Sequence, residues 1–307
     1  MSDQSINQDR ELAELLEEVR LIDVQARRLV TDVMAGGYTS AFRGSGIEFD
    51  HVREYVEGDS PRSIDWNVTA RMGRPFVKTY VDERELTVLF LLDLSASMEG
   101  GFGLWSARQA AARVSACLAL SATRNNDKVG LIAFSDGIDK YVPPAKGVGH
   151  TMRIVRDCLA LKGGSPRTDM RPALEFAAKV VRRHAIVFLV SDFLADDWQQ
   201  PLSLAARRHD VVAVRLLTPE LVPPGAGLLR VRDPESDTEQ IVDWGDRRVR
   251  IAYKQRAAAH RARTEEDLRR MGVDRMDVPI SRGRDKEMIA RPIMRFFRMR
   301  QARGAKR

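Results

Sequence analysis

The sequence predicts an α/β protein built around a doubly wound, mostly parallel sheet. Four strand-sized segments are apolar almost throughout, and they lie at residues 85–93, 127–134, 185–192 and 210–217. Strands of that kind are buried on both faces, which is typical of parallel sheets. The segments between them are long enough for helices, and parallel neighbours need such crossover connections. These observations predict a sheet with helices packed on both of its faces.

The remaining elements follow from the same patterns. Helical spacing of apolar residues predicts helices between the strands, at 104–124, 149–162, 170–183 and 197–208. A short edge strand is expected at 137–142. Beyond residue 218, a β-hairpin is predicted from the segments LVPPGAGLLRVRD and TEQIVDW. The C-terminal part is expected to form a charged helix, a last strand and a last helix, at about 247–271, 274–280 and 285–302.

The first 84 residues differ in kind from the rest. Apolar residues at helical spacing predict a helix over 9–34, which a pair of glycines ends. Residues 38–84 are rich in charge, glycine and aromatic side chains, so we expect short strands and tight turns there, with FVKTYV as one strand. The composition shifts only near residue 85. The predicted organisation is therefore an N-terminal helix and small β-rich segment (1–84) followed by an α/β domain (85–307).

The composition argues against several classes of function. Of 307 residues, 44% are hydrophobic and 30% are charged, which is ordinary for a globular domain with a substantial core. The net charge of +7 is not accompanied by a basic groove with interleaved aromatic side chains, so we expect no nucleic-acid site. No apolar stretch reaches the length of about 20 residues that a membrane span needs. The absence of a signal-peptide pattern and two isolated cysteines favour a cytoplasmic protein.

One motif stands at the end of the first strand, in the stretch VLFLLDLSASMEGG (88–101). Asp93 ends the apolar run, and Ser95 and Ser97 follow at alternate positions, so their three side-chain oxygens can face one point. Ligands of open α/β sheets sit at the carboxyl ends of the strands. A carboxylate with two hydroxyls is a set of hard oxygen ligands that suits Mg²⁺ or Mn²⁺. Two further loops should meet it at the same edge, one with Thr168 and one with Asp192.

Other interpretations of these residues remain open. Ser95 or Ser97 could cap the following helix, Asp169 could cap its own helix, and Asp192 could bond a loop. An Asp-based, metal-dependent phosphatase or hydrolase is the alternative enzyme, but the general acid that it needs two residues after Asp93 is a serine here. No GxxxxGK[ST] phosphate loop and no GxSxG motif is present. An interaction protein with an inactive metal site is a further alternative.

The combination of DLSAS, a Thr-bearing loop and a later SD resembles the metal-ion-dependent adhesion site of von Willebrand factor A domains. By that resemblance, Asp93, Ser95, Ser97 and Thr168 are direct or water-bridged ligands of the metal. Asp192 then holds a metal-bound water from the second layer of residues. In that family a carboxylate of a partner protein often completes the coordination of the metal. The resemblance therefore implies a von Willebrand A-like domain that binds proteins and is not an enzyme.

The segment before the sheet narrows the resemblance. The pattern GD-x-x-R-x-IDW-x-x-x-AR (58–71), followed directly by a von Willebrand A strand, is similar to the bacterial family called Domain of Unknown Function 58. Members of that family are commonly encoded beside MoxR-type AAA+ ATPases. The resemblance implies an adaptor in a chaperone-like system that works with such an ATPase.

The same charged segment contains four residues that could anchor a partner, and they are Arg62, Asp65, Trp66 and Arg71. Tryptophan and arginine are the residues that most often dominate protein interfaces. The alternative interpretation is structural, with ion pairs and a buried Trp66 that lock a small β-subdomain to the sheet.

Overall fold

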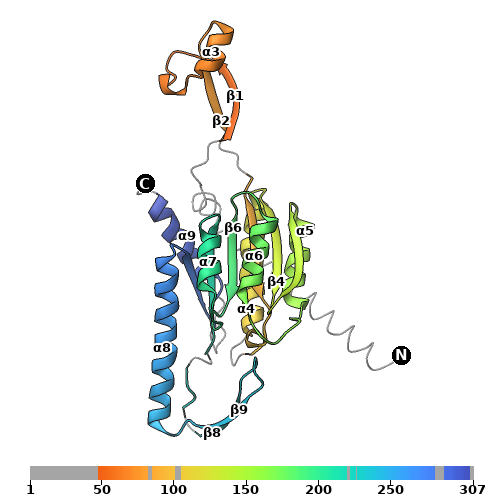
Figure 1. Ribbon diagram of the computed structural model, residues 1–307, viewed down its shortest axis with the longest axis vertical. Coiled ribbons are helices and arrows are strands. Elements are labelled where there is room, and N and C mark those ends of the chain that lie inside the picture. Colours follow the sequence, from red (N-terminus) through yellow and green to blue (C-terminus); the bar gives the residue numbers. More distant parts are fainter. Residues whose placement is uncertain are drawn as a thin grey trace, which may run out of the picture. The chain divides into compact units, whose positions relative to one another are not determined.

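The computed structural model describes residues 48–81, 85–100, 105–219, 222–225, 227–280 and 287–304. These residues fall into two compact units, one within Phe42–Glu85 and one from Leu86 onward (Figure 1). The helix predicted over 9–34 lies outside the described residues.

The larger unit contains a six-stranded sheet in the order β10-β7-β6-β3-β4-β5. All neighbours in it are parallel except β4 and β5, which are antiparallel. This confirms the predicted doubly wound, mostly parallel sheet. The strands are β3 (Thr87–Asp93), β4 (Lys128–Phe134), β5 (Ile138–Ala145), β6 (Ile186–Ser191), β7 (Asp210–Leu217) and β10 (Asp274–Pro279).

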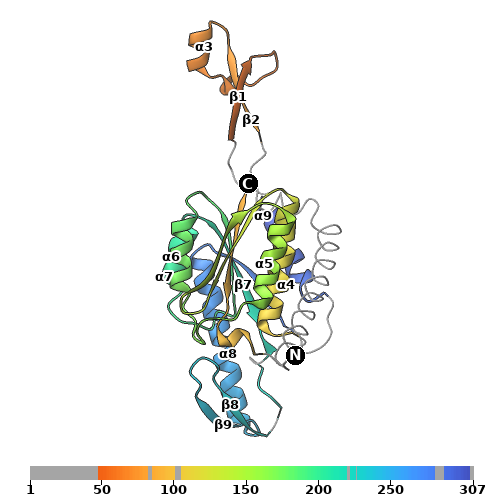
Figure 2. The ribbon, with the colours of Figure 1, turned by 90° about the vertical axis from the view of Figure 1, so that its right-hand side faces the viewer.

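Helices cover both faces of this sheet, as Figure 2 shows. One face packs against α6 (Met170–Val180), α7 (Gln199–Ala206) and α8 (Arg247–Arg270), and the core there extends from Leu91 of β3 to Leu268 of α8. The other face carries α4 (Ala107–Arg124), α5 (Val148–Ala160) and α9 (Ala290–Gly304). The predicted helices between the strands are thereby confirmed.

The central strand β3 is buried from Val88 through Asp93, so it has no solvent-exposed face. Its Phe90 stacks on Phe188 of β6, with ring centroids 5.3 Å apart. Burying a phenylalanine side chain contributes about 1.5–3 kcal/mol. The apolar run that predicts this strand ends at Asp93, which places a carboxylate at the carboxyl edge of the sheet.

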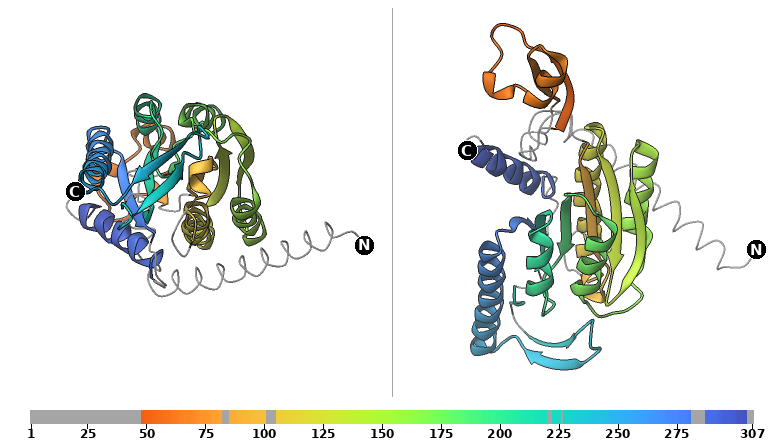
Figure 3. Two further views of the ribbon diagram at one scale, coloured as in Figure 1. Left: turned by 90° about the horizontal axis from the view of Figure 1, so that it is seen from below. Right: turned by 45° about the horizontal axis from the view of Figure 1, so that its top comes forward.

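The predicted hairpin is formed by β8 (Leu228–Arg232) and β9 (Glu239–Asp243), which pair antiparallel. Figures 1 and 3 show it along the edge of the sheet at which β3 and β6 end. Its strands are largely exposed, and Leu228 and Ile241 are 69% and 70% exposed. A two-stranded hairpin is only marginally stable by itself. Contacts of its turn with other loops therefore help to hold it in position.

The smaller unit consists of β1 (Glu48–Glu54) paired antiparallel with β2 (Phe76–Val81), a short 3₁₀ turn (Pro61–Ser63) and α3 (Trp66–Met72). The predicted strand FVKTYV is confirmed as β2. The expectation of strands and turns alone is wrong, because α3 lies between them. The Asp65 carboxylate begins α3 by accepting hydrogen bonds from the backbone N–H groups of Asn67 and Val68, at 2.9 and 3.2 Å.

The sequence predicts no membrane-spanning segment. Within the described ranges, none of the helices has the length and apolar character needed to cross a bilayer.

Candidate metal site

Three loops at the carboxyl edge of the sheet carry the predicted site residues. Asp93 is the last residue of β3, and Ser95 and Ser97 lie in the tight turn that follows it. Asp192 directly follows β6, which pairs parallel with β3 in a register that sets Leu92 beside Val190. The chain therefore places Asp93 and Asp192 at neighbouring strand ends, as the sequence predicts.

Asp93 is completely buried and hydrogen-bonded through both carboxyl oxygens. Its Oδ1 accepts from the backbone N–H of Ser95 at 2.9 Å, and its Oδ2 accepts from the Ser191 hydroxyl at 2.6 Å. Burial raises the pKa of Asp93 to about 7, with a further contribution from the negative charge of Asp192, although these hydrogen bonds oppose the shift. A charge at this position is thus costly unless a cation shares the site.

The second carboxylate is held in a similar environment. Asp192 is 9% exposed, and its Oδ1 accepts from the backbone N–H of Leu194 at 3.0 Å. Burial raises the pKa of Asp192, while hydrogen bonds from Leu194 and the Ser97 hydroxyl and the nearby His260 oppose the shift. Two buried carboxyl groups of one sign lie close enough to affect each other, and a divalent cation would relieve their repulsion.

The loop with Thr168 is locked onto the loop that follows Asp93. The backbone N–H of Ala96 donates to the carbonyl of Pro166 at 3.0 Å. Gly163 lies so close to Leu94 that a Cβ added there would be 2.3 Å from the Leu94 carbonyl oxygen. These contacts bring Thr168 to the same edge, where its hydroxyl donates to Oε1 of Glu235 at 2.7 Å.

The alternative role as a helix cap holds for Asp169 but not for Ser95. The side chain of Ser95 makes no capping hydrogen bond at the 3₁₀ turn. Helix α4 is instead capped by Ser106, in a reciprocal arrangement with Gln109. Asp169 does cap its own helix, because its Oδ1 accepts from the backbone N–H of Arg171 at 2.9 Å. The hydroxyls of Ser95 and Ser97 therefore remain directed at the site.

The donor set and its spacing fit a small divalent cation. Neighbouring corners of a magnesium octahedron lie about 3 Å apart, because each metal–oxygen bond is about 2.1 Å long. The Ser95 and Ser97 hydroxyl oxygens are 3.2 Å apart. Carboxylate and hydroxyl oxygens are the hard ligands that Mg²⁺ and Mn²⁺ take. In the part of the chain that the structure describes, clusters of three or more His, Cys, Asp or Glu side chains able to hold a metal are absent.

Comparison with known families identifies the chain. Residues 51–263 match the family described as protein of unknown function DUF58, which is more than half of the chain. The chain belongs to the DUF58 family. It is also 28% identical over 291 residues to uncharacterized proteins of Mycobacterium tuberculosis and Mycobacterium bovis, a match that covers 94% of this chain and 90% of those proteins.

Solved structures with some likeness to this DUF58 chain have low TM-scores. BatB from Bacteroides thetaiotaomicron has a TM-score of 0.44 at 16% identity, covering 72% of this chain and all of BatB. The VWA domain of SpRpn10 has a TM-score of 0.36 at 10% identity, covering 68% of this chain and 94% of that domain. A mussel byssus matrix protein with a zinc-occupied MIDAS motif has a TM-score of 0.33 at 16% identity and covers 44% of this chain and 38% of that protein.

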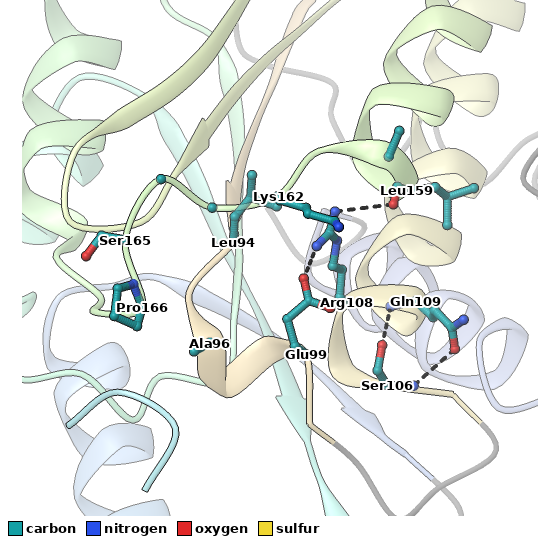
Figure 4. A pocket seen from close by; sticks show the side chains of 13 residues that line it. Leu94, Ala96, Glu99, Ser106, Arg108, Gln109, Leu159, Lys162, Ser165 and Pro166 are labelled. Atoms are coloured by element: carbon teal, nitrogen blue, oxygen red, sulfur yellow. Dashed lines mark hydrogen bonds and ion pairs between the residues drawn. The ribbon is translucent and has the colours of Figure 1, made fainter. Parts of the chain in front are cut away.

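A cavity of about 630 Å³ adjoins the site in this DUF58 chain, and Figure 4 shows the residues that line it. It touches both metal-site loops through Ala96, Ser165 and Pro166. On its far side the Arg108 guanidinium is ion-paired with Glu99 and donates to the Leu159 carbonyl at 3.2 Å. Part of the surface beside the site is therefore concave and bordered by the Arg108–Glu99 ion pair.

The four residues proposed as partner anchors lie in the smaller unit. Asp65 caps α3 and lies 3.5 Å from the Lys78 ammonium, which gives it a structural role. Trp66 is 69% exposed, so its indole is not buried among the described residues of its own unit, and the alternative in which it locks this unit to the sheet stays a prediction. Arg71 is exposed in the last turn of α3. The side chain of Arg62 lies outside the described residues, and the docking role of the four residues stays a prediction.

Sequence reasoning missed three residues that shape the site. The Ser191 hydroxyl donates to Asp93, and its place directly before Asp192 in the stretch VSD is the only sign of this role in the sequence. Ser135 follows β4, and its carbonyl and hydroxyl accept from Asp169 and Ser165 at 2.8 and 3.2 Å, which steadies the Thr168 loop. Glu235 lies 67 residues from its partner Thr168, and no sequence pattern connects the two.

Proposed function

We propose that this chain is a protein-binding module whose binding depends on Mg²⁺ or Mn²⁺ and which performs no catalysis. The observation that carries the proposal is the convergence of two buried carboxylates and two serine hydroxyls at one sheet edge, onto which the loop with Thr168 is hydrogen-bonded. Asp93, Ser95, Ser97 and Thr168 would hold the cation, and Asp192 would fix a water bound to it. The cation would supply an open coordination position for a carboxylate of a partner protein.

The chain's own residues prepare this site in three ways. The hydrogen bonds from Ser95 N–H and Ser191 Oγ orient the Asp93 carboxylate and leave further lone pairs available. The hydrogen bond between Ser97 and Asp192 joins the first loop to the end of β6. Burial lowers the local dielectric, so that an ion held there interacts more strongly with its ligands than it would in water.

The same geometry disfavours the alternative phosphatase or hydrolase. A nucleophilic aspartate needs an oxygen that a substrate can reach, whereas Asp93 is fully buried and both of its oxygens accept hydrogen bonds. The position two residues on, where a general acid would stand, is Ser95. We therefore assign the site to binding.

An adaptor role beside a MoxR-type AAA+ ATPase is the finer part of the proposal. Its support is membership of the DUF58 family together with the resemblance in the segment 58–71. The exposed Trp66 gives the smaller unit an aromatic anchor of the kind that dominates interfaces. In this account the metal site and the smaller unit are separate surfaces, and each would take its own partner.

Calorimetric titration of the wild-type chain with Mn²⁺ and with Mg²⁺ tests the metal site. We expect one weakly bound cation per chain, and no measurable binding to Asp93→Asn. The matched control is Asp169→Asn, which removes a carboxylate from the neighbouring loop whose task is to cap α6, and it should bind as the wild type does. If the wild type takes up neither ion at millimolar concentration, or Asp93→Asn binds equally well, the proposed function is wrong.

A further inference from the structure

The turn of the β8–β9 hairpin brings a carboxylate of the chain itself into contact with Thr168, one of the proposed metal ligands. The Glu235 Oε1 accepts the hydroxyl proton of Thr168 at 2.7 Å. Glu235 is half-buried, whereas its neighbours in the turn, from Arg232 to Pro234 and from Ser236 to Thr238, are exposed. The contact joins residues from two distant loops.

The turn that carries Glu235 is ordered by its own hydrogen bonds. The Asp233 carboxylate accepts from the backbone N–H groups of Glu235 and Ser236, at 2.9 and 3.3 Å. These hydrogen bonds lower the pKa of Asp233. The Asp237 N–H donates to the Asp233 carbonyl at 2.9 Å, and the hydroxyls of Ser236 and Thr238 are 2.8 Å apart. The backbone of Glu235 is thus held in place before any ion or partner binds.

The contact has the geometry of two neighbouring ligands of one cation. Adjacent oxygens around Mg²⁺ lie about 3 Å apart, and the Thr168 and Glu235 oxygens are 2.7 Å apart. A threonine hydroxyl that coordinates a metal uses an oxygen lone pair, so its proton must be donated elsewhere. Glu235 accepts that proton, which leaves the Thr168 lone pairs available for an ion.

We propose that Glu235 is an internal carboxylate ligand, occupying the coordination position that an acidic side chain of a partner would take. This inference rests on the proposed function. A partner that presents an aspartate or glutamate to the cation must then displace the hairpin turn. The displacement would not open the core of the larger unit, because the hairpin strands are largely exposed. The hairpin therefore makes the site selective for acidic segments that compete with Glu235.

The test measures Mn²⁺ on the full chain in two ways, by calorimetry and by the relaxation enhancement of water protons around the bound ion. Glu235→Gln keeps an oxygen that can accept from Thr168 but removes the carboxylate. We expect Mn²⁺ to bind this variant about tenfold more weakly or worse, and with a larger relaxation enhancement, because water replaces the lost ligand. Glu239→Gln removes the same charge from exposed β9, where Glu239 pairs with Arg230 at 3.5 Å, and should behave as the wild type.

Each outcome decides between the two proposals. If Glu235→Gln binds Mn²⁺ with wild-type affinity and relaxation while Asp93→Asn does not bind it, Glu235 is not a ligand and the proposed function stands. Weaker binding with unchanged relaxation means that Glu235 acts only through its charge, which also overturns the internal ligand. A wild-type chain that binds no Mn²⁺ overturns both proposals.

Discussion

Asp93→Asn is expected to make the cation-free protein more stable at pH 8, although it removes the central residue of the site. The pKa of Asp93 is raised from its ordinary value of 3.8 to about 7. Between about pH 4 and pH 7 the folded chain therefore keeps a proton on Asp93 that the unfolded chain has lost. Stability falls with rising pH wherever the folded state binds more protons. The cost of ionising Asp93 is fully present at pH 8.

The neutral asparagine does not carry this cost. A pKa difference of about three units corresponds to the order of 4 kcal/mol, and we expect a gain of a few kcal/mol in the free energy of unfolding at pH 8 in the presence of a chelator. The amide oxygen can still accept from the Ser95 N–H, and the amide N–H₂ can donate to Ser191. At pH 5, where the buried carboxyl of the wild type is protonated, the gain should be largely lost.

Urea unfolding of the two proteins at pH 5 and pH 8 measures this difference. Adding Mg²⁺ should narrow the difference at pH 8, because an ion that binds only the folded wild type stabilises it by about 2.7 kcal/mol at one hundred times its Kd. Asp169→Asn serves as the control and should show neither effect. An Asp93→Asn protein that is less stable than the wild type at pH 8 without cation would refute this account of Asp93.

Gly163→Ala is expected to produce the second large effect, by separating the two loops that share the site. A Cβ at residue 163 would lie 2.3 Å from the Leu94 carbonyl oxygen and 3.1 Å from its carbon. Both are backbone atoms next to Asp93, so no side-chain rotation can relieve the clash. Overpacking of this kind costs about 1–3 kcal/mol, and sometimes more. We also expect weaker cation binding, because Thr168 would move away from Ser95 and Ser97.

The matched control is Gly149→Ala, in the first turn of α5. An alanine Cβ there meets no heavy atom within 4 Å, and alanine favours helix over glycine, so stability should stay the same or rise slightly. Urea unfolding and Mn²⁺ titration of both variants provide the comparison. If Gly163→Ala unfolds and binds Mn²⁺ like the wild type, the close approach of the two loops is not required.

Much of the larger unit could be predicted because its strands are buried on both faces. A strand such as β3, apolar from Val88 to Leu92, has few other interpretations, and its end determines where Asp93 stands. The DxSxS spacing predicted where the site lies, because the carboxyl ends of parallel strands meet at one edge of the sheet. Helix α3 was missed because its short sequence lies among glycines and charges, and only the cap at Asp65 marked its start.

The contacts that complete the site were beyond sequence reasoning. The hydrogen bond from Thr168 to Glu235 depends on where a hairpin turn lies in space, and no periodicity encodes that position. Ser191 was overlooked because a serine that ends a buried strand has no property that separates it from an ordinary strand end. The exposure of Trp66 within its own unit was also beyond sequence reasoning, since large aromatic side chains are usually buried, whereas here it is 69% exposed.

The proposed function requires a cation at the carboxyl ends of β3 and β6. Anomalous diffraction from crystals grown with millimolar Mn²⁺ would locate the ion directly. We predict a peak within bonding distance, about 2.1 Å for an ion of this kind, of the Ser95, Ser97 and Thr168 hydroxyl oxygens. A map with no peak there, or with manganese bound only elsewhere on the chain, would contradict the account.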